Sequence, residues 1–494
     1  MNLFRRFPLA LGLVFSLTSA LRALEISDAQ IKKGIVLVTV TPVEEDSTRP
    51  WLKEQGNPQT RLGLVLSGKR ILVLESDIRL AALIEVRKHS SVHPVTARLV
   101  RADREVDLAI ITVEGDFFGD LAPLPFAPDA QPGAALQSVH IDGLFRVQRS
   151  AVTLAELETD SATGVTAFPI GDFSSIEPFP QGGLLVQDGK LAGFIHDRSN
   201  SKKLGFLFPS LLHSFEQQAA GTYKGFASIG FEYESLIDPA LRKHYTVPET
   251  SKGPLVTRVL PGTSAFGQLQ KGDVITAIDG IALDERGLFD AGVSGKQRLD
   301  LLFFSRRGRI RLPGEVLNLS VLRAGKPVAV AMTLKANEKT AVRVPALRVT
   351  ESSYVVEGGL VFLELSSTYL LAAYGANYAS VAPELAYLAQ SKHLRTEPGD
   401  DTIVVLSRLY PDDSNLGYEQ VQGAVVKKAA DIPIHNLKHF RSIIEKEKGS
   451  KFLKLELSAG RVIYLDSQNR SAINKRIRER YGIPADARII GEDT

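Results

Sequence analysis

The feature that most constrains this fold is a series of short apolar runs separated by turn residues in the first half of the chain. These runs recur between residues 31 and 215 and read GIVLVTV, RLGLVLSG, RILVLES, VTARLVRAD, VDLAIITVE, KLAGFIHD and LGFLFP. Runs of this length, bounded by Gly, Pro, Asn and Asp, are typical of strands. Many short strands with frequent turns indicate a β-barrel or a sandwich.

Two segments of this first region are less regular. SDIRLAALIEVRK fits either a strand or one helical turn, because its apolar positions suit both periods. PSLLHSFEQQAA is amphipathic and carries a Ser at a suitable N-cap position, which predicts a short helix that closes the region.

Two further units follow, at residues 223–335 and 341–493. In the first, DPALRKHY predicts a helix that begins at Asp–Pro, and Asp279–Gly280 predicts a hairpin turn. The second mixes strands such as EGGLVFLELS with helical stretches such as VAPELAYLAQSK. AVVKKAADIPIHNLKHFRSIIE in the second unit parallels DVITAIDGIALDERGLFDAGV in the first, each read as a strand, a turn and a helix. This weak repeat predicts that the two units share a fold.

Composition excludes several classes of site. The chain has no cysteine, which excludes disulfides, thiol catalysis and thiolate metal sites. His435 and His439 would share a helix face, but no nearby carboxylate completes a ligand set, so we expect a surface helix and no metal site. We find no phosphate loop or dinucleotide fingerprint, and we expect no cofactor. A net charge of +3 without a basic stripe argues against a nucleic-acid partner.

The N-terminus carries the pattern of a secretory signal. Arg5 and Arg6 precede an apolar stretch, and small residues follow, with cleavage expected after Ala20 or Ala23. Residues 1–23 are therefore predicted to be a signal peptide, and the mature chain to be periplasmic or secreted. The alternative is an uncleaved inner-membrane anchor, although the apolar stretch is short for a span, which needs about 20 residues.

The unit at residues 223–337 resembles a PDZ domain of the Deg/HtrA protease family. The resemblance rests on VLPGTSAFGQLQKGDVITAIDGIAL. Ser228, Ile229, Gly230 and Phe231 match the carboxylate-binding loop of that family. Consecutive N–H groups around a glycine can hold a peptide's C-terminal carboxylate, and the strand that follows can take the peptide as an added strand.

This resemblance implies a mostly β fold, with a trypsin-like double β-barrel followed by two PDZ-like α+β domains. The barrels would occupy residues 27–220. The motifs GGLVF, VVLSRLYPDDSNLGYE and NLKHF make residues 341–494 similar to the divergent second PDZ domain of plant-type Deg proteases. The family's members assemble as trimers or larger, so the resemblance also implies a homo-oligomer, or co-assembly with an active relative.

The resemblance also assigns the positions of a catalytic triad. Serine-protease chemistry needs a Ser nucleophile, a His base and an Asp that orients the His. DLAII places Asp107 at the Asp position, and ILVLESDI places Ser76 at the His position. FPQGGLL places Gln181 at the Ser position, with Gly182 and Gly183 completing the oxyanion loop. Both reactive groups are therefore replaced.

A shifted triad is the alternative. It would use Ser174 or Ser175 with His89 or His93, but these serines lack the Gly-Gly backbone that forms the oxyanion hole. Because removal of one triad member costs several orders of magnitude in rate, we expect an inactive protease fold.

The leading hypothesis is an exported pseudo-protease that binds unfolded polypeptides or protein C-termini through its PDZ domains. It would act in protein quality control as a chaperone, adaptor or regulator. The alternatives are an active serine endopeptidase with an unorthodox triad and a non-catalytic PDZ scaffold for assembly.

Overall fold

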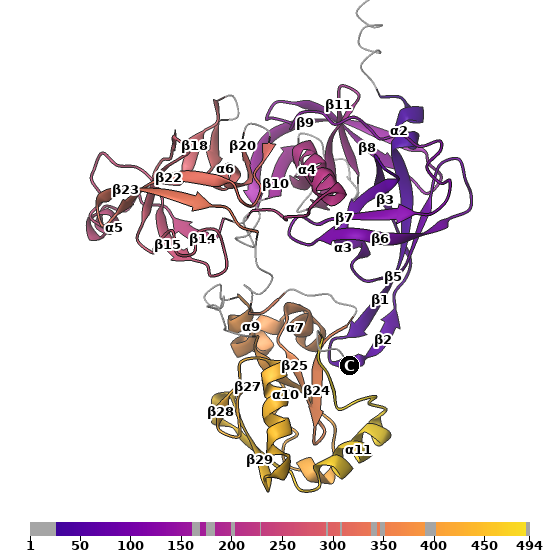
Figure 1. Cartoon of the computed structure of the whole chain (residues 1–494), viewed down its shortest axis with the longest axis vertical. Helices are drawn as coiled ribbons and strands as arrows, with labels where there is room; N and C mark the ends of the chain where they lie inside the picture. The colour runs from indigo at the N-terminus through magenta and orange to yellow at the C-terminus, as the bar shows by residue number, and fades with distance from the viewer. Residues whose placement is uncertain are drawn as a thin grey trace, which may run out of the picture.

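The computed structural model describes ten segments of the chain: residues 26–160, 168–173, 183–198, 203–227, 229–292, 295–306, 309–336, 343–345, 351–390 and 402–490. Their elements gather into three regions, which we call the barrel region, the first small sheet and the C-terminal region. Figure 1 shows the first two side by side and the third below them. The predicted signal segment, residues 1–23, lies outside the described residues.

The N-terminal barrel consists of six strands that close on themselves. Its hydrogen-bonded order is β1-β3-β4-β7-β6-β5, and β5 pairs back onto β1. The strands are β1 (Ile35–Asp46), β3 (Gln59–Leu66), β4 (Arg70–Leu74), β5 (Ala81–Arg87), β6 (Val95–Asp103) and β7 (Leu108–Val113). Helix α2 (Asp28–Gly34) leads into β1, and its start is fixed by a capping box between Ser27 and Gln30.

The segment that fitted both a strand and a helical turn contains both. Helix α3 (Glu75–Ile78) follows β4, and β5 begins three residues after it ends. The far end of β1 continues beyond the barrel and pairs with β2 (Arg49–Gln55) as a hairpin. No expectation from the sequence covered this hairpin.

A second barrel closes in the order β10-β13-β12-β11-β8-β9. Its strands are β8 (Ala135–Ile141), β9 (Val147–Asp160), β10 (Phe168–Phe173), β11 (Leu184–Gln187), β12 (Lys190–Arg198) and β13 (Lys203–Leu207). Leu108, Phe194 and Leu211 share one buried cluster, so both barrels and the following helix have a common core.

That helix, α4 (Pro209–Ala220), forms as predicted, but not with the predicted cap. Its N-cap is Phe208, and Pro209 occupies the first turn, where the missing N–H costs nothing. Ser210 instead donates from its N–H and its hydroxyl to the carboxylate of Asp129, at 2.9 and 2.6 Å.

The first small sheet has the order β14-β15-β16-β22-β23, with β17 beside β16. Its strands are β14 (Phe231–Glu234), β15 (Leu255–Val259), β16 (Val274–Ile278), β17 (Ile281–Ala282), β22 (Val316–Arg323) and β23 (Lys326–Thr333). Helix α5 (Pro239–His244) begins at the predicted Asp–Pro, with Asp238 as its N-cap. The predicted hairpin turn at Asp279–Gly280 joins β16 to β17, and both residues have positive φ.

The prediction of a helix directly after this turn is wrong. The segment forms a hairpin of β18 (Leu288–Asp290) and β19 (Lys296–Arg298), and helix α6 (Asp300–Phe304) follows it. Asp284 fixes the start of the hairpin, because its carboxylate accepts the N–H groups of Arg286 and Leu288. A second small hairpin, β20 (Ser305–Arg306) with β21 (Arg309–Ile310), leads from α6 back toward β22.

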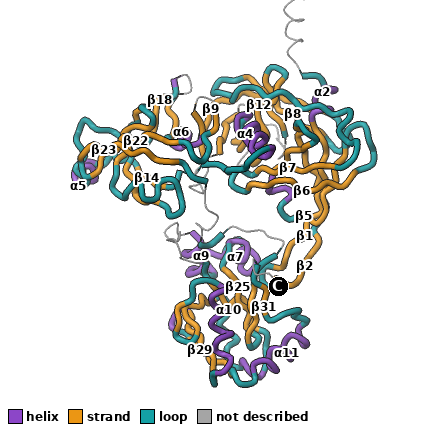
Figure 2. The backbone as a smooth tube through the Cα atoms, viewed as in Figure 1, coloured by secondary structure: helices purple, strands orange, loops and turns teal. Residues whose placement is uncertain are grey.

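The C-terminal region is a sheet of order β30-β29-β27-β26-β25-β24-β31, with β28 beside β27. Its strands are β24 (Tyr354–Glu357), β25 (Leu360–Glu364), β26 (Val404–Leu409), β27 (Ala424–Ala429), β28 (Ile432–Pro433), β29 (Phe452–Leu457), β30 (Val462–Asp466) and β31 (Ala487–Arg488). Its helices are α7 (Ser367–Tyr374), α8 (Tyr378–Val381), α9 (Pro383–Gln390), α10 (Leu437–Lys446) and α11 (Arg470–Tyr481), with short 3-10 turns η4 (Asp413–Asn415), η5 (Glu447–Gly449) and η6 (Ser458–Gly460). Figure 2 shows these helices around the sheet.

The predicted fold class is confirmed: the chain is mostly β, with a trypsin-like double barrel followed by PDZ-like α+β units. No helix in the described part of the chain has the length and apolarity that a membrane crossing requires.

Candidate functional site

Asp107 lies at the start of β7, inside the junction of the two barrels. Its backbone has a φ of +51°, a left-handed conformation that Asp tolerates better than most residues. The side chain is buried. Its backbone carbonyl accepts the N–H of Glu75 at 3.1 Å, which holds the start of α3 against this turn.

Ser76 meets Asp107, as the triad assignment expects of neighbouring positions. The N–H of Ser76 donates to Oδ1 at 2.7 Å, and its hydroxyl donates to Oδ2 at 2.9 Å. Both oxygens of the carboxylate therefore have a donor. In this arrangement Ser76 acts as a hydrogen-bond donor to Asp107, and an alcohol oxygen is too weakly basic to take a proton from a nucleophile near neutral pH.

His196 is the residue that sequence reasoning missed. Its Nδ1 lies 3.2 Å from Oδ2 of Asp107. His196 is on β12, where the pairing with β13 shifts between Ile195 and Asp197. A bulge of this kind re-aims a side chain, and the sequence around GFIHD carries no signal of it. The structure thus brings an imidazole to Asp107 from a different strand than the triad motif predicts.

Two ion-pair groups surround these residues. Glu75 is buried and binds Arg79 through Nε at 2.8 Å and Arg104 through Nε at 3.2 Å. Asp77 accepts Arg61 Nε at 2.9 Å. Burial raises the pKa of Asp77, and the negative charge of the nearby Asp107 raises it further. The arginines balance the carboxylates, so the network stabilises the turn that carries Ser76.

The remaining predicted catalytic residues are placed only in part. Gln181, Gly182, Ser174 and Ser175 lie outside the described residues. Gly183 is described, and its carbonyl accepts the N–H of Ile195 at 2.9 Å, which ties the end of the nucleophile loop to the strand of His196.

The two histidines of the shifted triad lie in the loop after β5. His89 packs edge-on against Phe145, with ring centroids 6.4 Å apart. His93 is exposed, and its N–H donates to the hydroxyl of Ser91. Within the described residues, the imidazole that contacts Asp107 is that of His196.

The predicted carboxylate-binding loop leads into β14. Ser228 lies outside the described residues, whereas Ile229 and Phe231 are buried. Gly230 has a φ of +80°, and a Cβ there would collide with the side chain of Thr263. The Thr263 hydroxyl lies 3.1 Å from the carbonyl oxygen of Gly230, which also accepts the N–H of Leu260 at 2.8 Å. Glycine is therefore required at this turn.

β14 is the first strand of its sheet, so its outer edge has no strand partner in the described part of the chain. Helix α6 faces it. Phe231 packs edge-on against Phe303 at 5.5 Å, and the Tyr233 hydroxyl donates to Asp300 at 2.8 Å. Arg298 Nε donates to the same carboxylate at 2.7 Å. An extended peptide could pair with this edge and leave both contacts with the helix in place.

The C-terminal region repeats this arrangement with one difference. Gly358 and Gly359 have positive φ and lead into β25, and Phe362 on β25 packs against Phe440 on α10 at 4.6 Å. β25 thus holds the topological place of β14. Its outer edge, however, is already paired with β24, and β24 in turn pairs with β31. The chain's own strand covers this edge.

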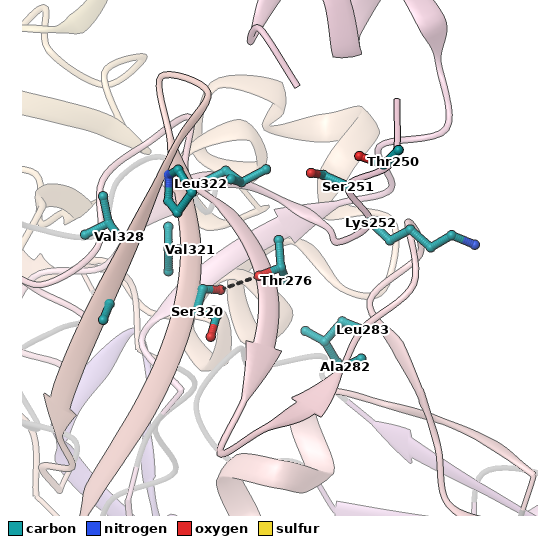
Figure 3. Close-up of a pocket in the computed structure, with 12 residues that line it drawn as sticks. Thr250, Ser251, Lys252, Thr276, Ala282, Leu283, Ser320, Val321, Leu322 and Val328 are labelled. Carbon is teal, nitrogen blue, oxygen red and sulfur yellow. Dashed lines mark hydrogen bonds between the residues drawn. The ribbon is translucent and has the colours of Figure 1, made fainter. Parts of the chain in front are cut away.

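A surface hollow of about 590 Å³ lies elsewhere on the first small sheet. It is lined by the loop at Thr250–Lys252 and by β16, β22 and β23, and within it Thr276 donates to the carbonyl of Ser320 at 3.0 Å (Figure 3). It contains none of the predicted site residues.

The chain is similar to a known domain family and to several known proteins. A PDZ domain family matches residues 344–488. The Arabidopsis thaliana protein named putative protease Do-like 3, mitochondrial, is 26% identical over 448 residues, which is 88% of this chain and 76% of the relative. Protease Do-like 2, chloroplastic, of the same plant is 23% identical over 94% of this chain and 76% of its own length. The chain is similar to these Deg/HtrA-type proteases over most of its length.

Among solved structures, the chain is similar to the HtrA-type protease AlgW with decapeptide. The identity is 19%, the match covers 63% of this chain and 99% of the other, and the TM-score is 0.45. The two plant relatives align with most of this chain.

Proposed function

We propose that this chain is a Deg/HtrA-type pseudo-protease that binds polypeptides without cleaving them through a Ser-His-Asp triad. The observation that carries the proposal is that Ser76, at the predicted His position, donates two hydrogen bonds to Asp107, because a serine hydroxyl there cannot act as the general base. The sequence places Gln181 at the nucleophile position, and an amide has no hydroxyl to attack a carbonyl.

Peptide binding is assigned to the first small sheet. β14 has an open edge beside the Gly230 turn, whereas β25 is covered by β24. Unfolded polypeptides or protein C-termini would add to β14, and the protein would serve quality control as a chaperone, adaptor or regulator. We further propose a homo-oligomer, a trimer or larger, and export after cleavage near residue 23.

The first test is chemical. The full chain is incubated with unfolded casein and with a fluorophosphonate probe. We expect neither cleavage nor labelling. A variant with Ser76→His and Gln181→Ser restores both missing groups and serves as the positive control for the fold. Labelling of the unmodified chain that disappears when any single serine is changed to alanine would contradict the proposal.

The second test is binding. Peptides with free C-termini are titrated into the full chain, and amide-capped versions of the same peptides are the control. Affinity should fall about tenfold or more with the capped peptides, because the Gly230 turn then loses the carboxylate. If no peptide binds while the chain still assembles, the scaffold hypothesis replaces this one.

Location and assembly need separate measurements. The N-terminal residue of the protein purified from its native host shows whether cleavage occurs near residue 23, and light scattering gives the oligomer mass. The named mitochondrial and chloroplastic relatives make an organelle the competing destination, which fractionation of the host cell distinguishes.

A second function is favoured by His196. The imidazole of His196 lies 3.2 Å from the buried Asp107, which matches the His–Asp contact of a triad. An endopeptidase with an unorthodox triad is therefore the competing candidate. It requires a serine nucleophile. If casein is cleaved, His196→Ala should abolish the cleavage, and His93→Ala should not.

A further inference from the structure

The β1–β2 hairpin leaves the barrel and ends on the C-terminal region, about 300 residues further along the chain (Figure 1). The tip of the hairpin is held by Asp46. Its Oδ1 accepts the N–H groups of Thr48 and Arg49 at 2.8 and 3.1 Å, and its Oδ2 accepts Arg49 Nε at 2.6 Å. Bonds within the hairpin therefore close its turn.

An aromatic anchor makes the contact. Trp51, the single tryptophan of the chain, packs edge-on against Tyr354 at 5.3 Å and lies 6.0 Å from Tyr410. The ring of Tyr410 in turn packs at a tilt against that of Tyr481, with centroids 4.7 Å apart. Tyr354, Tyr410 and Tyr481 come from β24, from the end of β26 and from the end of α11. Tryptophan anchors in aromatic pockets carry much of the energy of protein interfaces.

A buried ion pair fixes the orientation. Arg488 on β31 donates through Nη2 to Glu45 at 2.6 Å and to the carbonyl of Pro50 at 2.9 Å. The Glu45 side chain is only 2% exposed. Arg408 on β26 adds a bond to the Thr48 hydroxyl at 3.2 Å. Buried carboxylates are usually paired, and Arg488 supplies the opposite charge to Glu45 at this contact.

The base of the same hairpin contacts the end of the turn that carries Ser76. The N–H of Val43 donates to the carbonyl of Leu80 at 2.8 Å. Leu80 is four residues after Ser76 and ends the turn that begins with α3. One covalent strand, β1, therefore joins the turn of Ser76 to the surface of the C-terminal region.

We propose that the surface formed by Tyr354, Tyr410, Arg408 and Arg488 is a docking site whose ligand is the β1–β2 hairpin of the same chain. Docking latches the C-terminal region onto the barrel region. The two strands that cover the peptide edge of the C-terminal region, β24 and β31, supply Tyr354 and Arg488. This surface thus binds a segment of the same chain, whereas the peptide edge of the region, on β25, is covered by β24. The inference does not depend on whether the triad is active.

The absence of cysteine allows a direct test. Lys53 and Glu351 form an exposed ion pair at 3.2 Å across the contact, so Lys53→Cys and Glu351→Cys place two unique thiols there. The full chain is treated with a short bis-maleimide and separated on a denaturing gel. We expect an internally linked monomer. Linked dimers would show that a second copy supplies the hairpin and would overturn docking within one chain, and absence of linkage would overturn docking altogether.

The anchors are then tested in this double-cysteine chain. Trp51→Ala should lower the yield of linkage about tenfold or more, and so should Arg488→Ala, which changes the other side of the contact. Leu52→Ala is the matched control, because Leu52 is the next residue of the same strand and is exposed. Equal yields in all three variants would overturn the assignment of the anchors. In the Arg488→Ala chain with Trp51 retained, tryptophan emission should also shift to longer wavelength.

Discussion

At the scale of single residues, Asp107 organises the region of the predicted triad. It holds a left-handed backbone turn and accepts the N–H and hydroxyl of Ser76. Asp107→Ala should lower the free energy of unfolding by about 2–4 kcal/mol, because buried donors lose their acceptor and alanine is strained at this φ. Ser76→Ala loses only one hydroxyl donor and should cost about 0.5–1.5 kcal/mol. Urea unfolding followed by circular dichroism measures both, and equal costs would contradict this view of Asp107.

The motifs DLAII and ILVLESDI, which lie at the ends of regular strands, predicted neighbouring positions for Asp107 and Ser76. The two residues are hydrogen-bonded, and their assignment to triad positions stays a prediction. His196 could not be foreseen. It reaches Asp107 through a bulge in β12, and a bulge depends on pairing with β13 rather than on local residue types. Residues whose position depends on long-range register are therefore the ones that reading the motifs misses.

Asp412 gives a pH-dependent prediction at the same scale. Its carboxylate accepts Arg476 at 2.6 and 3.0 Å, and hydrogen bonds from Arg476, together with those from Ser414, hold the pKa of Asp412 well below its usual range. The folded state therefore favours the ionised form. The resulting stability is present above the unfolded pKa and is lost as the pH falls through the folded pKa.

Asp412→Asn should therefore cost about 1 kcal/mol near pH 7, and the difference from the unmodified chain should shrink below about pH 4. The measurement is denaturant unfolding followed by the fluorescence of Trp51. Trp51 packs against Tyr410, which lies two residues before Asp412 in the sequence. A difference that stays constant over this pH range would show that the Arg476 pair does not contribute.

At the scale of elements, the turn before β14 has the strictest requirement for glycine, at Gly230. Gly230 and Gly280 share a φ of +80°, but a Cβ at Gly230 meets Thr263, whereas a Cβ at Gly280 meets nothing within 4 Å. Gly280→Ala should cost about 1 kcal/mol from backbone strain alone. Gly230→Ala should cost more and should also abolish peptide binding. Calorimetry with the peptides described above checks this, and unchanged affinity in Gly230→Ala would remove β14 from the proposed site.

The internal repeat between the two small sheets led to one correct and one wrong prediction. The repeat correctly predicted that the two small sheets share a fold, since Phe231 with Phe303 and Phe362 with Phe440 occupy matching places. It wrongly predicted a helix at the segment that forms β18 and β19. There the carboxylate of Asp284 and the glycines at 287 and 292 favour tight turns, and this local chemistry outweighs the parallel with α10.

At the scale of the whole molecule, the three regions are joined by contacts that could not be predicted from the sequence. The β1–β2 hairpin is rich in charged residues and resembles a solvated loop until Arg488 and Tyr354 are placed beside it. The division into residues 27–220 and the units that follow rests on the apolar pattern of each unit and stays a prediction. The packing of these units could not be predicted, because it depends on pairs of residues hundreds of positions apart.

The contact between the barrel region and the first small sheet gives the last prediction. Ile310 on β21 is 3% exposed and belongs to the same buried cluster as Leu211 and Phe215 of α4. Ile310→Ala should lower the local stability of this contact by about 2–4 kcal/mol, the usual cost of such a truncation. Hydrogen exchange of the full chain should then speed up in α4 and in β20–β21, while α10 keeps its protection. Val316→Ala, at an exposed position of β22, is the control. Unchanged exchange in α4 would mean that the first small sheet is tethered to the barrels by the chain alone.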